Sequence, residues 1–418
     1  MNERIRADFP ILEDIIYMDS AATSLTPEPV LEAVLSYYRQ YNANVGRGVH
    51  RLSRIATQKY KDAHEKIAEF IGIGAGSVRE GEGRAVDGAV IFTKNTTEAI
   101  NMVAYGLRWA KRDEVVTTLL EHHSNFLPWL RLKEQGVIAK VKIVKPDTDP
   151  DMAGWFDLDD FKAAIDARTR LVAVTQVSNV LGTVLPVKEI SAICKENGSL
   201  LLVDGAQSAP HRRIDVEELG CDFFAFSGHK MLGPTGTGIL YMRDPDVLEP
   251  TFFGGGMVET VSEADYRLAG GYERFEAGTP HIAGGIGLGR AVDYLNNIGM
   301  EKIEAHEARL SKRLLKGLQS ITGVQVYGYG SSSLDHGTGI DRIGVAAFNL
   351  DGLHPHDVAV MLAEASDIMV RSGHHCCMPL MNYLGLKDGT VRASLYLYNT
   401  EEEVDRFLET VTEIVDTV

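Results

Sequence analysis

Cysteine is scarce in this chain, and long hydrophobic runs and an excess of basic residues are missing. The 418 residues include 4 cysteines, too few for a disulfide framework. Asp and Glu outnumber Lys and Arg by 58 to 42, giving a formal net charge of −16, which argues against nucleic acid or an anionic membrane as a main partner. No apolar stretch approaches the roughly 18 residues of a membrane span, and the charged start "MNERIRADFPILED" is not a secretory signal. We expect a cytoplasmic protein with reduced thiols.

Short apolar runs alternate with helical patterns from about residue 88 onward. Strands are predicted at 89–93, 170–179, 199–205 and 221–228, and a helix ending at Gly198 lies between the middle two. Alternating strands and helices predict an α/β fold with a mainly parallel sheet covered by helices.

The pattern changes after about residue 290. A long amphipathic helix, a turn-rich polar segment, a strand, a helix and another strand follow, and Thr400 with Glu403 forms a capping-box pattern before the last helix. This order predicts a smaller α+β domain, with a boundary near residue 292. The division we expect is an N-terminal segment packing with the small domain, a large domain and a small domain: 1–26, 27–292 and 293–418.

Two charged residues follow predicted strands within an otherwise apolar and glycine-rich sequence. Lys230 comes after the strand in "FSGHKMLGPTGTG", and Asp204 ends the strand in "VDGAQ". Either residue alone could be an ordinary loop or capping residue. Open α/β sheets bind ligands at these strand ends, however, and a lysine for an imine with an acid for a pyridinium nitrogen is the pair that pyridoxal phosphate (PLP) requires.

A phosphate-binding corner and a ring-stacking group are also predicted. In "FTKNTTEAIN", Thr96 and Thr97 begin a helix after a strand, where free N–H groups and the helix dipole attract phosphate. Ser227 and His229 flank Lys230 and could complete the corner. "LEHHSN" supplies a histidine that could stack on a flat pyridine ring or be structural.

Arginines in the second domain are candidates for binding a substrate carboxylate. Arg371 and Arg392 could each form bidentate pairs with a carboxylate. A surface salt bridge is the alternative role for both.

The segment "RSGHHCCMPL" could form a metal site, a disulfide or a reactive thiol. Zinc sites space their ligands, and we expect four consecutive extended residues to point alternately to opposite faces, so no metal site is predicted. A bond between adjacent cysteines would be strained. A reactive thiol needs nearby positive charge, which Arg371 and the two histidines could supply. The same alternation predicts that only one of Cys376 and Cys377 faces a substrate.

The ordered motifs identify a family. The chain resembles the SufS-like branch of the cysteine desulfurases, fold-type I PLP enzymes of the aminotransferase class V group, from about residue 5 to 415. The similarity is carried by "YMDSAATS", "NVGRGVHRLS", "TTEAIN", "EHHSN", "VSNVLGT", "VDGAQ", "FSGHKMLGPTGTGILY", "RFEAGTP" and "RSGHHCCMPLM". The resemblance implies a large domain built on a mainly parallel, seven-stranded sheet, and PLP as cofactor.

The resemblance also implies the following roles: Lys230 for the Schiff base, Asp204 for the pyridine nitrogen, Gln207 for the ring oxygen, His122 for ring stacking, Thr97, Ser227 and His229 for the phosphate, Thr279 for the phosphate of a partner subunit, Asn179 and Arg392 for the substrate carboxylate, and Cys376 as nucleophile. The expected reaction converts L-cysteine to L-alanine and an enzyme persulfide. The expected partners are a second copy of the chain and a sulfur-acceptor protein of iron–sulfur assembly.

This chain departs from the family at Cys377, where a small residue is usual. It also has an extra polar stretch around 331–341 and a longer connection near 147–154. The related alternatives are a selenocysteine lyase or another class V reaction, and the unrelated one is a non-catalytic sulfur carrier or metal-binding protein. The sequence does not decide between cysteine and selenocysteine, name the acceptor, or give Cys377 a role beyond that of a packed bystander or a relay thiol.

Overall fold

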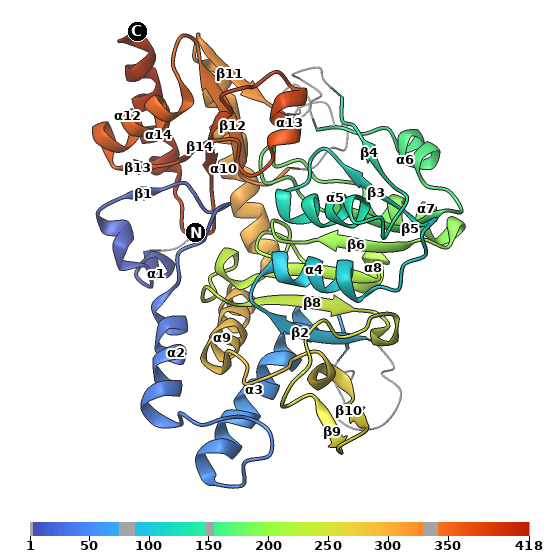
Figure 1. Ribbon diagram of the computed structural model, residues 1–418. Coiled ribbons are helices and arrows are strands. Elements are labelled where there is room, and N and C mark those ends of the chain that lie inside the picture. Colours follow the sequence, from blue (N-terminus) through green and yellow to red (C-terminus); the bar gives the residue numbers. More distant parts are fainter. Residues whose placement is uncertain (1–2, 75–87, 148–153, 329–341, 418) are drawn as a thin grey trace.

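The computed structural model describes residues 3–74, 88–147, 154–328 and 342–417. It has two main sheets, each with its own helices (Figure 1). The larger sheet contains seven strands in a single layer. The smaller sheet contains four strands and lies in the C-terminal part of the chain.

The seven-stranded sheet is parallel except for one strand, which confirms the predicted α/β class. The exception is β8, which is antiparallel to both of its neighbours. All four strands predicted from apolar runs belong to this sheet. Its strand order is β2 (Ala89–Thr93), β8 (Gly238–Met242), β7 (Phe223–Ser227), β6 (Leu200–Asp204), β5 (Thr169–Thr175), β3 (Glu114–Thr118) and β4 (Lys140–Val144).

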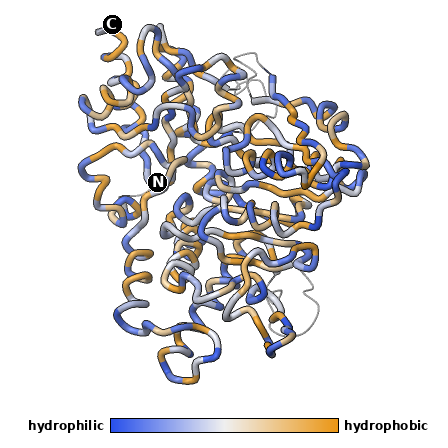
Figure 2. Tube along the Cα trace, viewed as in Figure 1, coloured by the Kyte–Doolittle hydropathy of each residue, from blue (hydrophilic) through white to orange (hydrophobic). Residues whose placement is uncertain are grey.

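Helices cover both faces of this sheet because its strands bury side chains in both directions. On β6, Leu201 and Val203 belong to one apolar core and Leu202 belongs to the other. The strands are accordingly coloured mostly as hydrophobic (Figure 2). The helices of this part are α2 (Glu28–Gln40), α3 (Arg51–Phe70), α4 (Thr96–Gly106), α5 (Leu127–Glu134), α6 (Leu158–Ala164), α7 (Val187–Asn197), α8 (Val216–Leu219) and α9 (Ile282–Ile298).

Helix α7 ends as predicted. Gly198 follows it with φ of 68°, in the left-handed region, and its N–H caps the helix. Glycine adopts this conformation without the steric cost that a side chain brings.

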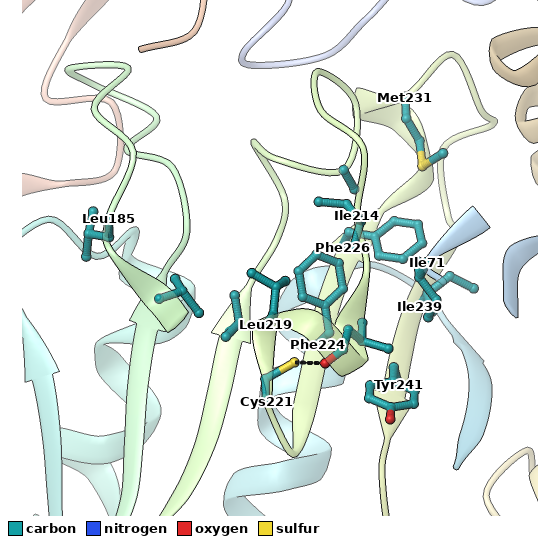
Figure 3. Close-up of a cluster of buried hydrophobic side chains, with 14 of the residues drawn as sticks. Ile71, Leu185, Ile214, Leu219, Cys221, Phe224, Phe226, Met231, Ile239 and Tyr241 are labelled. Atoms are coloured by element: carbon teal, nitrogen blue, oxygen red, sulfur yellow. Dashed lines mark hydrogen bonds between the residues drawn. The ribbon is translucent and has the colours of Figure 1, made fainter. Parts of the chain in front are cut away.

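The aromatic cluster below β7 supports the segment that carries Lys230. Phe224 and Phe226 point from β7 into the same apolar core as Met231, and Ile239 and Tyr241 of β8 pack beside them (Figure 3). This packing buries β7 along its whole length, up to the point at which the chain turns away from the sheet.

The smaller sheet is antiparallel, in agreement with the predicted α+β region. Its order is β11 (Val324–Tyr327), β12 (Val345–Leu350), β15 (Thr390–Ser394) and β14 (Arg371–Gly373). Its helices are α10 (Met300–Ser320), α12 (Pro355–Ser366), α13 (Met378–Tyr383) and α14 (Glu401–Asp416). A separate apolar core joins this sheet to α10, α12 and α14.

The N-terminal segment lies against the small domain (Figure 1). After α1 (Glu3–Arg6), the strand β1 (Ile16–Tyr17) pairs in parallel with β13 (Ile368–Met369). Met18 then packs into the core of the small domain. The division of the chain into 1–26, 27–292 and 293–418 stays a proposal, and residue 292 itself lies inside α9.

Several elements were not predicted from the sequence. They include β8, the hairpin of β9 (Val258–Val261) and β10 (Tyr266–Leu268), and the short strands at the domain junction. The polar stretch at 331–341 and most of the longer connection at 147–154 lie outside the described residues. No helix in the described part of the chain is long and apolar enough to cross a membrane.

The capping box of α14 gives a stability prediction. The Thr400 hydroxyl accepts a hydrogen bond from the N–H of Glu403, and the Glu403 carboxylate accepts one from the N–H of Thr400. Thr400→Ala removes one of these bonds and should lower the free energy of unfolding by about 1 kcal/mol in urea denaturation. The control is Thr412→Ala, an exposed position in the same helix, which should change it by less than about 0.5 kcal/mol. Equal losses in both variants would contradict the role of the cap.

Candidate active site

A cavity of about 210 Å³ lies where the carboxyl ends of β5, β6 and β7 meet the small domain. Twelve of the thirteen predicted site residues line it, and Thr279 does not. The twelve are Thr96, Thr97, His122, Asn179, Asp204, Gln207, Ser227, His229, Lys230, Arg371, Cys376 and Arg392. The structure therefore brings together residues from both domains.

Lys230 is held on a short helical turn directly after a strand. β7 ends at Ser227, and the 3-10 helix η3 (Gly228–Lys230) follows. A Cβ at Gly228 would lie 2.2 Å from Oγ1 of Thr237, so a larger residue would disturb this turn. Burial lowers the pKa of the Lys230 amine to about 8, while the Asp204 carboxylate opposes the shift. Part of the Lys230 population therefore carries an uncharged amine near pH 7.

Asp204 and Gln207 present oxygen atoms to the cavity. Asp204 ends β6, and its Oδ1 accepts from the N–H of Ala206 at 2.9 Å. Burial raises the pKa of Asp204, an effect that its bond to Ala206 and the Lys230 charge reduce. Gln207 donates from Nε2 to the carbonyl of Ala21 at 2.7 Å, but its Oε1 is buried without a partner among the described residues. An unpartnered buried amide oxygen indicates that a polar ligand group belongs beside it.

The start of α4 forms the end of the cavity that was predicted to bind phosphate. Thr96 donates from its backbone N–H to Oγ of Ser227 at 2.9 Å, and the two hydroxyl groups lie 2.7 Å apart. The Thr97 hydroxyl lies 2.7 Å from that of Ser124. Ser124 also lines the cavity, and the sequence did not single it out, because its place depends on the turn after β3.

The two adjacent histidines after β3 have different positions. His122 lines the cavity, and its Nδ1 accepts from the N–H of Ser124 at 3.1 Å. Burial, with a smaller contribution from Lys230, lowers the pKa of His122 to about 3. His122 is therefore a neutral flat ring at physiological pH. His123 instead contacts the small domain.

The segment around Cys376 is tied to the large domain by hydrogen bonds. His123 donates from its N–H to the carbonyl of Cys376 at 2.7 Å, and its Nε2 accepts from the N–H of Met378 at 3.2 Å. Asn179 donates from Nδ2 to the carbonyl of His375 at 2.9 Å. These bonds place the Cys376 thiol at the cavity that contains Lys230.

The two neighbouring thiols differ sharply in exposure. Cys376 is exposed and lines the cavity, whereas Cys377 is fully buried. The Cys377 thiol lies 3.3 Å from the carbonyl oxygen of Glu121, and burial raises its pKa well above the usual range. Cys377 is therefore a poor nucleophile in the folded chain. Cys194 and Cys221 are buried as well, and burial raises the pKa of each to about 12.

The expectation that this segment is extended was wrong. His375 and Cys376 have φ values of 50° and 55°, in the left-handed region, so they form a turn. Local chirality disfavours this conformation for residues with side chains. Hydrogen bonds to residues distant in the sequence hold this turn, and sequence periodicity does not reveal such bonds. The two thiols are therefore separated by a turn and not by the alternation of an extended segment.

One of the expected sources of positive charge near Cys376 is wrong. His375 is buried, and burial lowers its pKa to about 2, so it supplies no charge at neutral pH. Its Nε2 lies 2.9 Å from Oγ1 of Thr390. Arg371, which was also expected to supply charge, lines the same cavity as Cys376. The charges of Lys230 and Arg392 interact with Cys376 as well.

Arg392 is a buried cation at the junction of the domains. It is 2% exposed, and it donates from Nη2 to Oδ1 of Asp19 at 2.9 Å and from Nη1 to the carbonyl of Asn179 at 3.0 Å. Arg371 stands opposite it on β14. Asp19 was not predicted as a site residue, although it belongs to "YMDSAATS". Its pairing requires a contact across 373 residues of sequence.

In the described part of the chain, no group of three or more His, Cys, Asp or Glu side chains could hold a metal ion. Thr279 is exposed and lies outside the cavity of its own chain.

Comparison with known proteins adds the family. The aminotransferase class-V family matches residues 16–407. The chain belongs to this family. Its members are PLP-dependent enzymes. The resemblance to the cysteine desulfurases is confirmed, and these matches are compatible with the SufS-like branch.

Relatives that match this chain over nearly its whole length are named cysteine desulfurases. Probable cysteine desulfurases from Methanothermobacter thermautotrophicus and Pyrococcus abyssi are 47% and 46% identical to this chain, each over 99% of it and over 98% and 97% of their own lengths. A solved structure of a cysteine desulfurase from Thermococcus onnurineus is 44% identical, with a TM-score of 0.91, covering 100% of this chain and 99% of that chain. The cysteine desulfurase CsdA from Escherichia coli is 32% identical, with a TM-score of 0.86 and coverage of 100% and 99%. These structures confirm the predicted fold class.

The buried neutral state of His375 predicts a loss of stability in acid. An unfolded histidine gains a proton below about pH 6.5, whereas folded His375 stays neutral down to about pH 2. The unfolded state therefore binds more protons as pH falls, and stability decreases below about 6.5. Between pH 7.5 and 5, urea denaturation should show a loss about 2 kcal/mol smaller for His375→Gln than for the wild type. Identical losses in the two proteins would show that His375 titrates in the folded state.

Proposed function

We propose that this protein is a cysteine desulfurase that converts L-cysteine to L-alanine and retains the sulfur on Cys376 as a persulfide. The observation that carries the proposal is the exposed Cys376 thiol, which lines the same cavity as the buried Lys230 amine. An amine alone would suit many class V reactions, but a thiol in that position suits sulfur removal. The full-length relatives confirm the predicted desulfurase function.

The cavity residues fit PLP as the cofactor. A lysine amine for its aldehyde, a buried carboxylate for its ring nitrogen and the unpartnered Gln207 oxygen beside them match a substituted pyridine. His122 would stack on the ring. At the phosphate end we propose Thr96, Thr97, Ser227 and His229. Bound PLP supplies a place for the electrons released when the bonds at the substrate Cα and Cβ are broken.

Lys230 is proposed to move the Cα proton. With a pKa of about 8, the amine can accept a proton and return it near neutral pH, as a general base and acid require. Asn179, Arg371 and Arg392 are proposed to hold the substrate carboxylate and so orient Cα toward Lys230. The guanidinium of Arg392 is suited to this because its N–H donors form a planar fork that matches the two oxygens of a carboxylate.

Cys376 is proposed to take the sulfur. Its thiolate attacks the sulfur of the substrate, a sulfur–sulfur bond forms, and the carbon–sulfur bond breaks. The electron pair of that bond stays with the carbon fragment, which gains a proton to become alanine. The persulfide on Cys376 then passes its outer sulfur to an acceptor thiol. We propose an acceptor protein of iron–sulfur assembly and a cytoplasmic location, both of which remain predictions.

The desulfurase proposal is tested with L-cysteine and a reductant, by measuring alanine and sulfide. Cys376→Ser should lose nearly all turnover yet retain yellow, PLP-loaded protein, because the thiol is the nucleophile and does not hold the cofactor. Cys377→Ala should stay within a few-fold of the wild type, because Cys377 is buried away from the cavity. Lys230→Ala is the negative control, and borohydride should no longer fix PLP to it.

Two outcomes would contradict this mechanism. Alanine release by the wild type no faster than by Lys230→Ala would refute the desulfurase activity. A dead Cys377→Ala beside an active Cys376→Ser would show that the other sulfur acts.

The protein is also proposed to be a homodimer in which Thr279 of each chain completes the phosphate site of the other. Thr279 is exposed and absent from its own cavity, and the nearby hairpin exposes Val261 and Tyr266. Light scattering should give twice the mass of the 418-residue chain. Thr279→Ala should weaken PLP binding several-fold, whereas Thr412→Ala should not. A fully active monomer would rule this out.

A further inference from the structure

Two arginines face each other in the cavity wall formed by the small domain. β14 and β15 are antiparallel, and Arg371 lies directly opposite Arg392 in their register. Both side chains line the cavity. Like charges in this arrangement repel each other, so the pair favours an anion close to both.

The anion supplied by the chain itself is Asp19. Its Oδ1 accepts from Nη2 of Arg392 at 2.9 Å, and it is the one carboxylate paired with Arg392 in the described ranges. The carbonyl of Asn179 takes Nη1, while Nε is buried and has no partner among the same residues. The Arg392 guanidinium therefore keeps one buried N–H donor, at Nε, without a partner, while the Asp19 carboxylate offsets part of its positive charge.

Asp19 is fixed in place on both sides. Ser394 donates its N–H to the carbonyl of Met18 at 2.7 Å, and Ser20 donates its N–H to the carbonyl of Ser394 at 3.3 Å. The segment is therefore bonded to β15 immediately before and after Asp19. Ala21 and Ala22, which follow, line the cavity. Asp19 does not itself line the cavity, but these bonds hold its carboxylate against Arg392, which does.

We propose that Asp19 limits how tightly the Arg371–Arg392 pair holds the carboxylate of substrate and product. The inference rests on the proposed function, because it assumes an amino acid in this cavity. A carboxylate on Arg392 repels a second carboxylate that approaches the same guanidinium. L-Alanine retains the carboxylate of L-cysteine, so two uncompensated arginines would hold the product as firmly as the substrate. Asp19 weakens both and favours product release.

The test changes the charge of Asp19 while leaving its shape. Asp19→Asn retains an oxygen that can accept from Nη2 of Arg392 but removes the negative charge. L-Alanine binding to the PLP-loaded protein is followed by cofactor absorbance, and kcat and KM are measured for L-cysteine. Ethylamine, which has an amine and no carboxylate, is the matched probe. Asp14→Asn, an exposed position in the same segment, is the matched control.

The expected result is specific for the carboxylate. Asp19→Asn should bind L-alanine about tenfold more tightly and lower KM for L-cysteine without raising kcat, while its affinity for ethylamine stays unchanged. Asp14→Asn should match the wild type with both probes. If Asp19→Asn does not fold, Asp19→Ser is measured, and the same tightening is expected.

Three outcomes would overturn the proposal. Unchanged or weaker L-alanine binding by the variant would show that Asp19 does not limit carboxylate affinity. An equal gain for ethylamine would show that the change is not specific for the carboxylate. If the PLP-loaded wild type itself does not respond to L-alanine, the proposed function fails first, and the role of Asp19 fails with it.

Discussion

The cavity exists because one loop of the small domain is bonded to the turn that follows β3. His123 accepts a hydrogen bond from the N–H of Met378 and donates its own N–H to the carbonyl of Cys376. Asn179 donates to the carbonyl of His375, and the Cys377 thiol lies against the carbonyl of Glu121. Without these contacts the large domain would hold a lysine and an acid with no thiol near them. The small domain would hold a thiol with no reactive partner. The chemistry that we propose needs both halves.

Burial sets the charge states of the groups on either side of this junction. It lowers the pKa of Lys230 to about 8, that of His122 to about 3 and that of His375 to about 2. The two histidines are consequently neutral, one as a flat ring and the other as a hydrogen-bonding group. Lys230 is left close to its titration point. A single physical cause, the removal of water, gives three side chains different chemical tasks.

The sequence predicted the large sheet and most of the site because both are encoded locally. Apolar runs marked the strands, and the strand ends marked Lys230 and Asp204, since parallel strands collect their carboxyl ends at one edge. The strand β8 was not predicted, and its antiparallel direction depends on tertiary pairing that the sequence pattern does not reveal. Asp19 and Ser124 were missed for a related reason, as their roles depend on neighbours that only the fold supplies.

The turn at His375 and Cys376 shows where local rules fail. Period-two alternation predicted that only one of the two thiols faces a substrate. Of the two, only Cys376 lines the cavity, but the backbone there is left-handed rather than extended. Bonds from Asn179 and His123 impose this conformation against its local preference. The assignment of Cys376 as the proposed nucleophile came from the family resemblance and not from the alternation.

The same tethering restricts where sulfur can go. Hydrogen bonds to the large domain hold the backbone at His375, Cys376 and Met378, so the segment is anchored beside the cavity. A sulfur atom added to Cys376 would project only about one bond length farther, roughly 2 Å. The segment is therefore not a long free arm that extends away from the cavity. Any protein that collects the sulfur must bring its own thiol to the mouth of the cavity.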